Sequence, residues 1–255
     1  MSGIPSRRAL GGGLDHSGNS WRVSHSMSTR RTKDPVNQPN IDFAEKRGAV
    51  SLGLLKSREW IEDPRRFLFS QSRYKFVSKM LSERKRVLEI GCGDAFNAPI
   101  VMQEVRHLTV TDFDEEFIAD AKARMPPEYA YEARVHNFLN GPLADTFDAA
   151  YSLDVLEHID SAQERMFIDN IVACLTFDAI MIIGMPSLES QAYASPGSKA
   201  GHVNCKTAPD LKKLMEEYFH SVFMFSMNDE VIHTGFHKMA HYLLAVAAHP
   251  KKSAR

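Results

Sequence analysis

The chain of 255 residues is long enough for one large domain with a sizeable core, or for two small ones. It is 44% hydrophobic and 25% charged, with a formal net charge of -1, which is typical of a globular protein and gives no basic field for nucleic acid. No apolar run approaches the roughly 20 residues of a membrane span. Three cysteines without paired spacing fit a reducing compartment, so we expect a cytoplasmic protein with no membrane partner.

The N-terminal segment is rich in Ser, Gly, Arg and Asn and has no hydrophobic period. We predict a disordered N-terminal leader over residues 1–40. An Arg-rich, acid-poor leader is also typical of an organelle transit peptide, but no amphipathic helix is evident. "MSTRRTKDP" begins at Met27 and resembles a true start, so the sequence leaves open whether residues 1–26 belong to the protein.

The next segment has the period of helices. In "AEKRGAVSLGLLKSREWIE" and "PRRFLFSQSRYKFVSKML", apolar residues recur three and four apart, and Pro64 suits a first helical turn. We predict an N-terminal helical cap over residues 41–82. Its aromatic residues are expected to form a core face, with a substrate wall as the alternative: Phe67, Phe69, Tyr74 and Phe76.

Strand-like and helical patterns then alternate. The strand-like runs are "RVLEI", "HLTVTD", "YEARVHN", "FDAAYSL" and "AIMIIGM", and helical patterns separate most of them. After the helix "APDLKKLMEEYF", two strand-like runs follow without a helix between them. We predict an α/β Rossmann-like domain over residues 83–250, with a seven-stranded, mostly parallel sheet, an antiparallel C-terminal strand and helices on both faces.

A glycine pair follows the first predicted strand. Gly91 and Gly93 would let the backbone approach a ligand and turn sharply into a helix. The dinucleotide fingerprint requires a third glycine where this chain has Phe96, and a cofactor without pyrophosphate would not need it. Asp112 ends the second predicted strand, where an acid can hold the two hydroxyls of a ribose.

"VLEIGCGDAF", "TVTDFDEEFIADAKAR" and "FDAAYSLDVLEHI", in this order, resemble class I S-adenosylmethionine-dependent methyltransferases of the small-molecule type, over residues 84–247. The resemblance implies S-adenosyl-L-methionine as the cofactor. The family usually has an acid after the third strand, where this chain has Asn137. The cofactor-binding residues that we expect on this basis are Glu89, Gly91, Cys92, Gly93, Asp112, Phe113, Asn137, Phe138, Ser152 and Leu153.

The acceptor side is expected around the end of the fourth strand and a long loop. By resemblance, Asp154 faces the methyl group, and the pair Glu157-His158 has a structural role, with His158 as a catalytic base as the alternative. Residues 185–207 are small and polar without a period, which predicts a lid loop. His202 in this loop is the preferred candidate to contact the acceptor or accept its proton. The alternative is that His202 only fixes the loop, with Asn204 or Thr207 capping the next helix.

A second polar cluster occupies residues 227–242 and contains three histidines. We interpret it as a substrate-side loop in which His233 is a second candidate base. A solvated hairpin and a metal site are the alternatives, and we predict no metal ligands.

The sequence therefore predicts methyl transfer, at oxygen, to a small-molecule acceptor that is a saccharide or an anion. A non-catalytic methyltransferase-like binding protein and a nicotinamide-dependent oxidoreductase are the alternatives, and Phe96 counts against the second. Nucleic acid is a disfavoured partner because the chain has no net basic charge. The oligomeric state is open, with a homodimer among the options.

Overall fold

The computed structural model describes residues 30–251, which are divided into two units between Val50 and Ser51. Most of the predicted leader, residues 1–29, lies outside the described residues. In the first unit, a short 3-10 helix η1 (Pro35–Asn37) precedes α1 (Gln38–Arg47), and no described residue of these two helices is buried. The helix therefore begins before residue 40, inside the predicted leader.

The predicted helix from Ala44 to Glu62 is wrong as a continuous element. α1 ends at Gly48, which has a φ of 77°, and α2 (Leu54–Glu62) begins after Gly53, which has a φ of 90°. Both backbones lie in the left-handed region that glycine tolerates, so these two glycines divide the segment.

In the second unit, α3 (Pro64–Met80) follows α2 after one residue. The Asp63 carboxylate accepts a hydrogen bond from Arg65 N at 3.3 Å, and Pro64 occupies the first turn. Three of the four predicted aromatics, Phe69, Tyr74 and Phe76, pack against the main core, as expected. The fourth, Phe67, contacts the rings of Trp60 and Phe96 instead, with centroids 5.5 and 5.7 Å apart.

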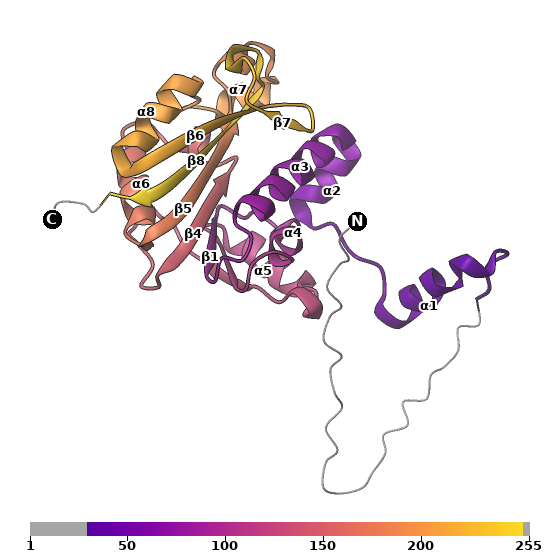
Figure 1. Ribbon diagram of the computed structural model, residues 1–255. Coiled ribbons are helices and arrows are strands. Elements are labelled where there is room, and N and C mark those ends of the chain that lie inside the picture. The colour runs from indigo at the N-terminus through magenta and orange to yellow at the C-terminus, as the bar shows by residue number, and fades with distance from the viewer. Residues whose placement is uncertain (1–29, 252–255) are drawn as a thin grey trace, which may run out of the picture. The chain divides into compact units, whose positions relative to one another are not determined.

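One sheet organises this unit, and it confirms the predicted fold class (Figure 1). The five strands from β3 to β5 in the sheet order pair in parallel, and β8 is antiparallel to β5. β7 is a short eighth strand that forms a hairpin with β6, in addition to the seven expected. In sheet order the strands are β3 (Glu132–Val135), β2 (Leu108–Asp112), β1 (Val87–Ile90), β4 (Phe147–Leu153), β5 (Leu175–Pro186), β8 (Tyr242–Pro250), β6 (Phe219–Asn228) and β7 (Val231–His233).

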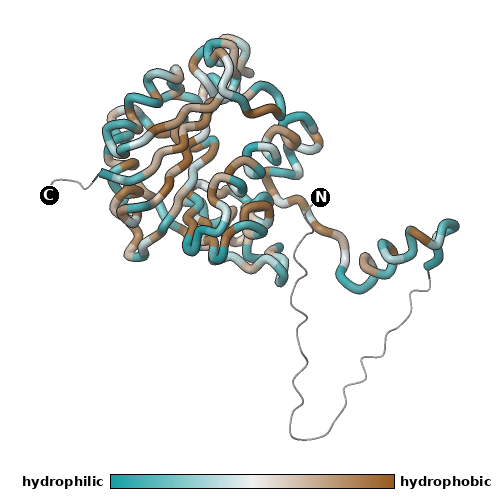
Figure 2. The backbone as a smooth tube through the Cα atoms, in the orientation of Figure 1, coloured by the Kyte–Doolittle hydropathy of each residue, from teal (hydrophilic) through white to brown (hydrophobic). Residues whose placement is uncertain are grey.

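Helices cover both faces of the sheet. Along β1, Val87 joins a core cluster with residues of α3, α4 (Ala98–Met102) and α5 (Glu115–Arg124), whereas Leu88 joins a second cluster with residues of α6 (Glu164–Val172) and α8 (Ala208–Tyr218). This alternation follows from the two-residue period of a strand. Figure 2 shows the resulting hydrophobic band along the central strands. Each helix in residues 30–251 is too short or too polar to cross a bilayer.

Connections at the carboxyl ends of the strands carry short helices. η3 (Leu156–His158) follows β4, whereas η2 (Pro127–Tyr129) lies at the opposite edge of the sheet, before β3. The predicted lid loop contains η4 (Glu189–Tyr193) and α7 (Pro196–Gly201), and η5 (His237–Met239) lies between β7 and β8. The loop that has no sequence period is therefore partly helical, in elements too short for a period to be read.

Candidate active site

The loop after β1 has the shape that two glycines permit. Gly91 and Gly93 have φ values of 74° and 51°. A Cβ on Gly91 would lie 2.3 Å from Val155 Cγ2, so no other residue fits without a shift. Between them, the thiol of Cys92 is buried, and burial raises its pKa, which agrees with a small residue in a tight place.

Asp112 is bonded to this loop from the end of the neighbouring strand. Its carboxylate is buried and accepts hydrogen bonds from Gly93 N at 2.8 Å and from Asp114 N at 3.0 Å, through different oxygens. Each oxygen keeps a further lone pair that can accept a hydroxyl hydrogen. The adjacent Phe113 is 72% exposed. The chain itself thus holds the predicted ribose acid in place.

Glu89 is the third residue of β1, two positions before Gly91 of the glycine loop. Its carboxyl group accepts hydrogen bonds from the hydroxyls of Tyr74 at 2.5 Å and Tyr151 at 2.8 Å. Burial raises the pKa of Glu89 from its ordinary 4.5 to about 7, although the two hydroxyls oppose this shift. Glu89 can therefore change its charge near neutral pH.

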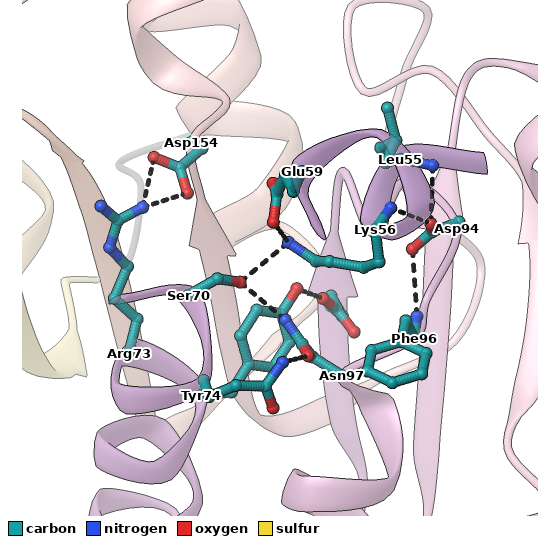
Figure 3. A network of polar contacts seen from close by, with 12 residues as sticks. Leu55, Lys56, Glu59, Ser70, Arg73, Tyr74, Asp94, Phe96, Asn97 and Asp154 are labelled. Atoms are coloured by element: carbon teal, nitrogen blue, oxygen red, sulfur yellow. Dashed lines mark hydrogen bonds and ion pairs between the residues drawn. The ribbon is translucent and has the colours of Figure 1, made fainter. Parts of the chain in front are cut away.

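Asp94, which the sequence analysis did not single out, joins helix α2 to the same loop (Figure 3). Its carboxylate accepts hydrogen bonds from Leu55 N at 2.8 Å and Lys56 N at 2.9 Å, and from Phe96 N at 3.2 Å. The carboxylate thus satisfies free N–H groups in the first turn of α2. A Cβ on Gly93 would lie 2.5 Å from Leu55 Cδ1, so α2 covers the glycine loop.

A polar network continues from α2 into α3 and α4. Lys56 Nζ donates to Ser70 Oγ at 2.9 Å, and Asn97 Nδ2 donates to the same hydroxyl at 2.8 Å. Ser70 and Asn97 are both buried. Figure 3 shows these side chains pointing toward one another between the helices and the glycine loop. The wall of the site on this side is therefore fixed by hydrogen bonds as well as by aromatic packing.

Two residues expected at the adenine follow β3. The Asn137 Oδ1 accepts a hydrogen bond from Leu139 N at 2.9 Å, within its own turn. The Phe138 ring is 2% exposed and packs in the second core cluster, with its centroid 6.4 Å from that of Phe167. The structure therefore places the Phe138 ring in the core, and a contact between the Phe138 backbone N–H and the adenine stays a prediction.

Ser152 and Leu153, at the end of β4, are also buried. The Ser152 hydroxyl donates to Ile90 O at 3.2 Å, across to β1. Leu153 packs close to Gly184 of β5, where an added Cβ would lie 2.6 Å from Leu153 Cδ2. Both residues lie beside the end of β1 and so border the glycine loop.

Asp154 begins the acceptor side. Its φ is 58°, and its N–H donates to Gly184 O at 3.0 Å. Its two carboxylate oxygens accept from Arg73 Nη1 at 3.0 and 2.7 Å, and the Arg73 guanidinium lies 3.6 Å above the Tyr242 ring (Figure 3). Asp154 is thus paired with a cation from α3.

The predicted lid loop is bonded to η3. Val203 N and Asn204 N donate to Glu157 O at 2.8 and 3.0 Å. This contact places the His202 ring against the His158 ring, with centroids 5.2 Å apart. Burial, and then the nearby His158, lower the pKa of His202. The structure therefore brings His202 together with Glu157 and His158, which sequence reasoning treated separately.

His233, the second candidate base, has both ring nitrogens bonded in the structure. Its Nδ1 accepts from Gly235 N at 2.9 Å, and its Nε2 bonds to Asn228 Oδ1 at 2.8 Å, so both ring nitrogens are used inside the β6–β7 hairpin. Among the described residues, 229–241 contain no group of side chains that could hold a metal ion. The group of this kind in the described part of the chain is Glu157, His158 and His202.

Known proteins resemble this chain over most of the second unit. The chain matches the methyltransferase-domain family over residues 60–218. It is 28% identical over 153 residues to a probable S-adenosylmethionine-dependent methyltransferase of Mycolicibacterium smegmatis, covering 56% of each chain. A second relative of this description, from Mycobacterium tuberculosis, is 27% identical over 120 residues, with 45% of this chain and 42% of that one covered. The chain thus spans about half the length of the curated relatives it matches.

Solved structures show the same fold. The N-methyltransferase NodS of Bradyrhizobium japonicum, in complex with S-adenosyl-L-homocysteine, superposes with a TM-score of 0.55 at 21% identity over 71% of this chain and 86% of that chain. A putative methyltransferase of Haloferax volcanii, solved with the activator Trm112, has a TM-score of 0.60 at 12% identity, over 76% of this chain and 97% of that one.

The fold and the glycine loop define a class I methyltransferase domain. The chain belongs to the methyltransferase-domain family, and S-adenosylmethionine is the cofactor. The residues present fit that cofactor, since each oxygen of the Asp112 carboxylate keeps a free lone pair for a ribose hydroxyl. The individual contacts to the cofactor stay predictions.

Proposed function

We propose that the chain transfers the methyl group of S-adenosylmethionine to an oxygen atom of a small polar acceptor, a saccharide or an anion. One observation carries this proposal. Side chains around the ends of β4 and β8 and on the neighbouring turns contain buried polar atoms without a hydrogen-bond partner among the described residues. They are Arg73 Nε, both carboxylate oxygens of Glu157, Glu189 Oε2, His237 Nδ1, His241 Nε2 and Tyr242 Oη.

These atoms belong to one region. Arg73 interacts electrostatically with Tyr242 and Glu157, and also with His241. Glu189 and His237 lie on η4 and η5, which pack together. Buried polar groups in proteins are almost always hydrogen-bonded, so a group of unpaired ones favours a polar ligand as their partner.

When bound, S-adenosylmethionine supplies an activated methyl group. The residues of this chain then have to bind the acceptor, orient it and exclude water. The lid segment, fixed to η3 through Glu157 O, supplies His202, and α3 supplies Arg73. A basic imidazole and a guanidinium favour an acceptor with hydroxyl or anionic groups.

The acceptor class is tested by incubating the protein with methyl-labelled cofactor and fractionated cell extract. We expect label in a small molecule or saccharide, with mass spectrometry placing the methyl group on oxygen. Label on nitrogen, or in RNA or protein, contradicts the proposal. Binding of S-adenosylhomocysteine with no transfer into any fraction would instead favour a non-catalytic binding protein.

His202 is tested by replacing it with alanine. We expect His202→Ala to lower turnover about tenfold or more, while calorimetry shows nearly unchanged affinity for S-adenosylhomocysteine. His220→Ala, which alters an exposed histidine on β6, is the matched control. Equal loss of turnover and of cofactor affinity would make His202 a purely structural residue.

A further inference from the structure

We propose that Glu157, His158 and His202 form a binding site for one divalent transition-metal ion at the acceptor side of the domain. Each residue offers one ligand atom, and these atoms all lie within 4.8 Å of one another. They come from η3 and from the residue that ends α7, and the hydrogen bonds from Val203 N and Asn204 N to Glu157 O hold these two segments together. The sequence analysis expected no metal ligands.

The Glu157 carboxylate is the observation that points to a ligand. It is 1% exposed, and neither oxygen has a hydrogen-bond partner among the described residues. Buried carboxylates in proteins are paired or bind metal ions. The closest approach is from His158 Nε2, which lies 4.0 Å from Glu157 Oε1, too far for a hydrogen bond.

Both histidines keep one ring nitrogen with a free lone pair. His158 Nδ1 lies 2.9 Å from Gly201 O, and because a carbonyl can only accept, the proton is on Nδ1 and Nε2 is free. His202 Nδ1 lies 2.9 Å from Gln191 Oε1. The Gln191 amide is oriented by its Nε2, which donates to Ser187 O at 3.2 Å, so His202 also carries its proton on Nδ1.

This arrangement is the one that metal-binding histidines use. Their second ring nitrogen usually donates to a carbonyl or carboxylate oxygen, which fixes the tautomer and the ring orientation. Ligand atoms bound at 2.0–2.2 Å from a zinc ion lie about 3 to 3.5 Å apart, so the present spacing needs a shift of roughly 1 Å.

The neighbouring cations do not neutralise Glu157 by hydrogen bonding. Arg73 directs its Nη1 to the two oxygens of Asp154, and Lys206 Nζ pairs with Glu164 at 2.7 Å and donates to Asn204 Oδ1 at 3.0 Å. The carboxylate is therefore left for a ligand that approaches between the two imidazoles.

The donor set indicates the class of ion. Two imidazoles and one carboxylate suit Zn²⁺, Co²⁺, Mn²⁺ or Fe²⁺ better than Ca²⁺ or Mg²⁺, which prefer oxygen ligands. Three protein ligands leave a position open. The role of the ion rests on the proposed function. An acceptor hydroxyl would occupy the open position and lose its proton to water. Its oxygen would then bond to the methyl carbon as the carbon–sulfur bond breaks.

Cobalt titration of the full chain tests the site without any turnover. We expect Co²⁺ to give a saturable visible absorption at one equivalent. Glu157→Gln, His158→Ala and His202→Ala should each weaken binding about tenfold or more, and Gln191→Leu should weaken it by a similar or smaller factor through the orientation of His202. His220→Ala is the matched control and should bind as the unchanged protein does.

Two results would overturn the proposal. One is the lack of a saturable cobalt spectrum, and the other is equal cobalt affinity in the three ligand variants and the control. Circular dichroism and S-adenosylhomocysteine titration of every variant separate misfolding from ligand loss, and His158→Ala is informative even if Glu157→Gln does not fold, because the His158 side chain is 49% exposed. Cobalt binding without methyl transfer would refute the proposed function alone.

Discussion

The cofactor side and the acceptor side of this domain differ in how their polar groups are satisfied. On the cofactor side, the carboxyl groups of Glu89, Asp94 and Asp112 all accept hydrogen bonds from the chain itself. On the acceptor side, Glu157 and the ring nitrogens His237 Nδ1 and His241 Nε2 are buried without a partner among the described residues. The first region is prepared for its ligand by internal bonds, whereas the second depends on ligands for its polar groups.

This difference has an energetic meaning. An internal hydrogen bond contributes about 1 kcal/mol to folding, whereas an unpaired buried polar group costs roughly 1–3 kcal/mol. The cofactor side therefore adds to the stability of the fold, and the acceptor side lowers it until something binds. We therefore expect ligands to change the stability of variants on the two sides in opposite directions.

The largest expected effect is on the cofactor side. Asp112→Ala removes the acceptor of two backbone N–H groups and the predicted partner of the ribose, and we expect about a 100-fold or greater loss of affinity for S-adenosylhomocysteine. Isothermal titration measures it. Asp114→Ala, which removes the cap of α5 but not the ribose partner, is the control. Equal affinity in the two variants would remove Asp112 from the cofactor site.

Gly91→Ala tests the fixed shape of the glycine loop. The added Cβ would lie 2.3 Å from Val155 Cγ2, on a backbone with a φ of 74°. We expect the free energy of unfolding to fall by about 2–4 kcal/mol, from strain and overpacking together. Chemical denaturation measures this value. Gly197→Ala, in α7 with nothing within 4 Å of the added atom, should not destabilise the protein.

Glu89→Gln tests the buried carboxyl through pH. Because the pKa of Glu89 in the folded protein is raised to about 7, the carboxyl stabilises the fold fully below pH 4.5 and loses this contribution as the pH rises through 7. The full difference corresponds to roughly 3 kcal/mol. We expect Glu89→Gln to be more stable than the unchanged protein at pH 8 and similar to it at pH 4.5, in denaturation without cofactor.

A pH-independent difference between these two proteins would mean that Glu89 does not change its charge in this range. The groups that act on it in the fold are the hydroxyls of Tyr74 and Tyr151, which favour the charged form, and the carboxylates of Asp112 and Asp94, which oppose it. Tyr74→Phe provides a second check, because removal of one donor should raise the pKa of Glu89 further.

The smallest expected effect is that of His233→Ala. Both ring nitrogens of His233 bond within the β6–β7 hairpin, so its loss should lower the free energy of unfolding by only about 1 kcal/mol and leave turnover within about twofold. Steady-state kinetics of His233→Ala and His202→Ala, measured side by side, test this expectation. A loss of turnover as large as that of His202→Ala would show that the hairpin carries chemistry after all.

The sequence signals on the cofactor side are local. Gly91, Gly93 and the strand-terminal Asp112 each follow directly from a strand and a turn, and parallel strands bring such positions to one edge of the sheet. The same logic yielded the fold class. A single sequence does not tell whether a ring after a strand faces the cofactor or the core, and the structure places the Phe138 ring in the core.

The acceptor side could not be predicted to this depth. His158 and His202 meet only because the segment after α7 bonds to Glu157 O, and that contact joins backbone atoms, which leave no mark in the residue types. Asp94 was missed for a similar reason, because its partners are the N–H groups of α2. The break between α1 and α2, by contrast, had a readable signal in Gly48 and Gly53.

The cap that Asp94 provides for α2 has a consequence for synthesis. α2 has nine residues, too few to be stable alone, and its first N–H groups bond to Asp94 and, 66 residues later than Leu54, to Asp120. A ribosome adding about 5–20 residues per second needs roughly 3–13 s to make that span. The helix that is made first in this unit therefore receives its N-terminal hydrogen bonds only after β1, β2 and the first turns of α5 have been made.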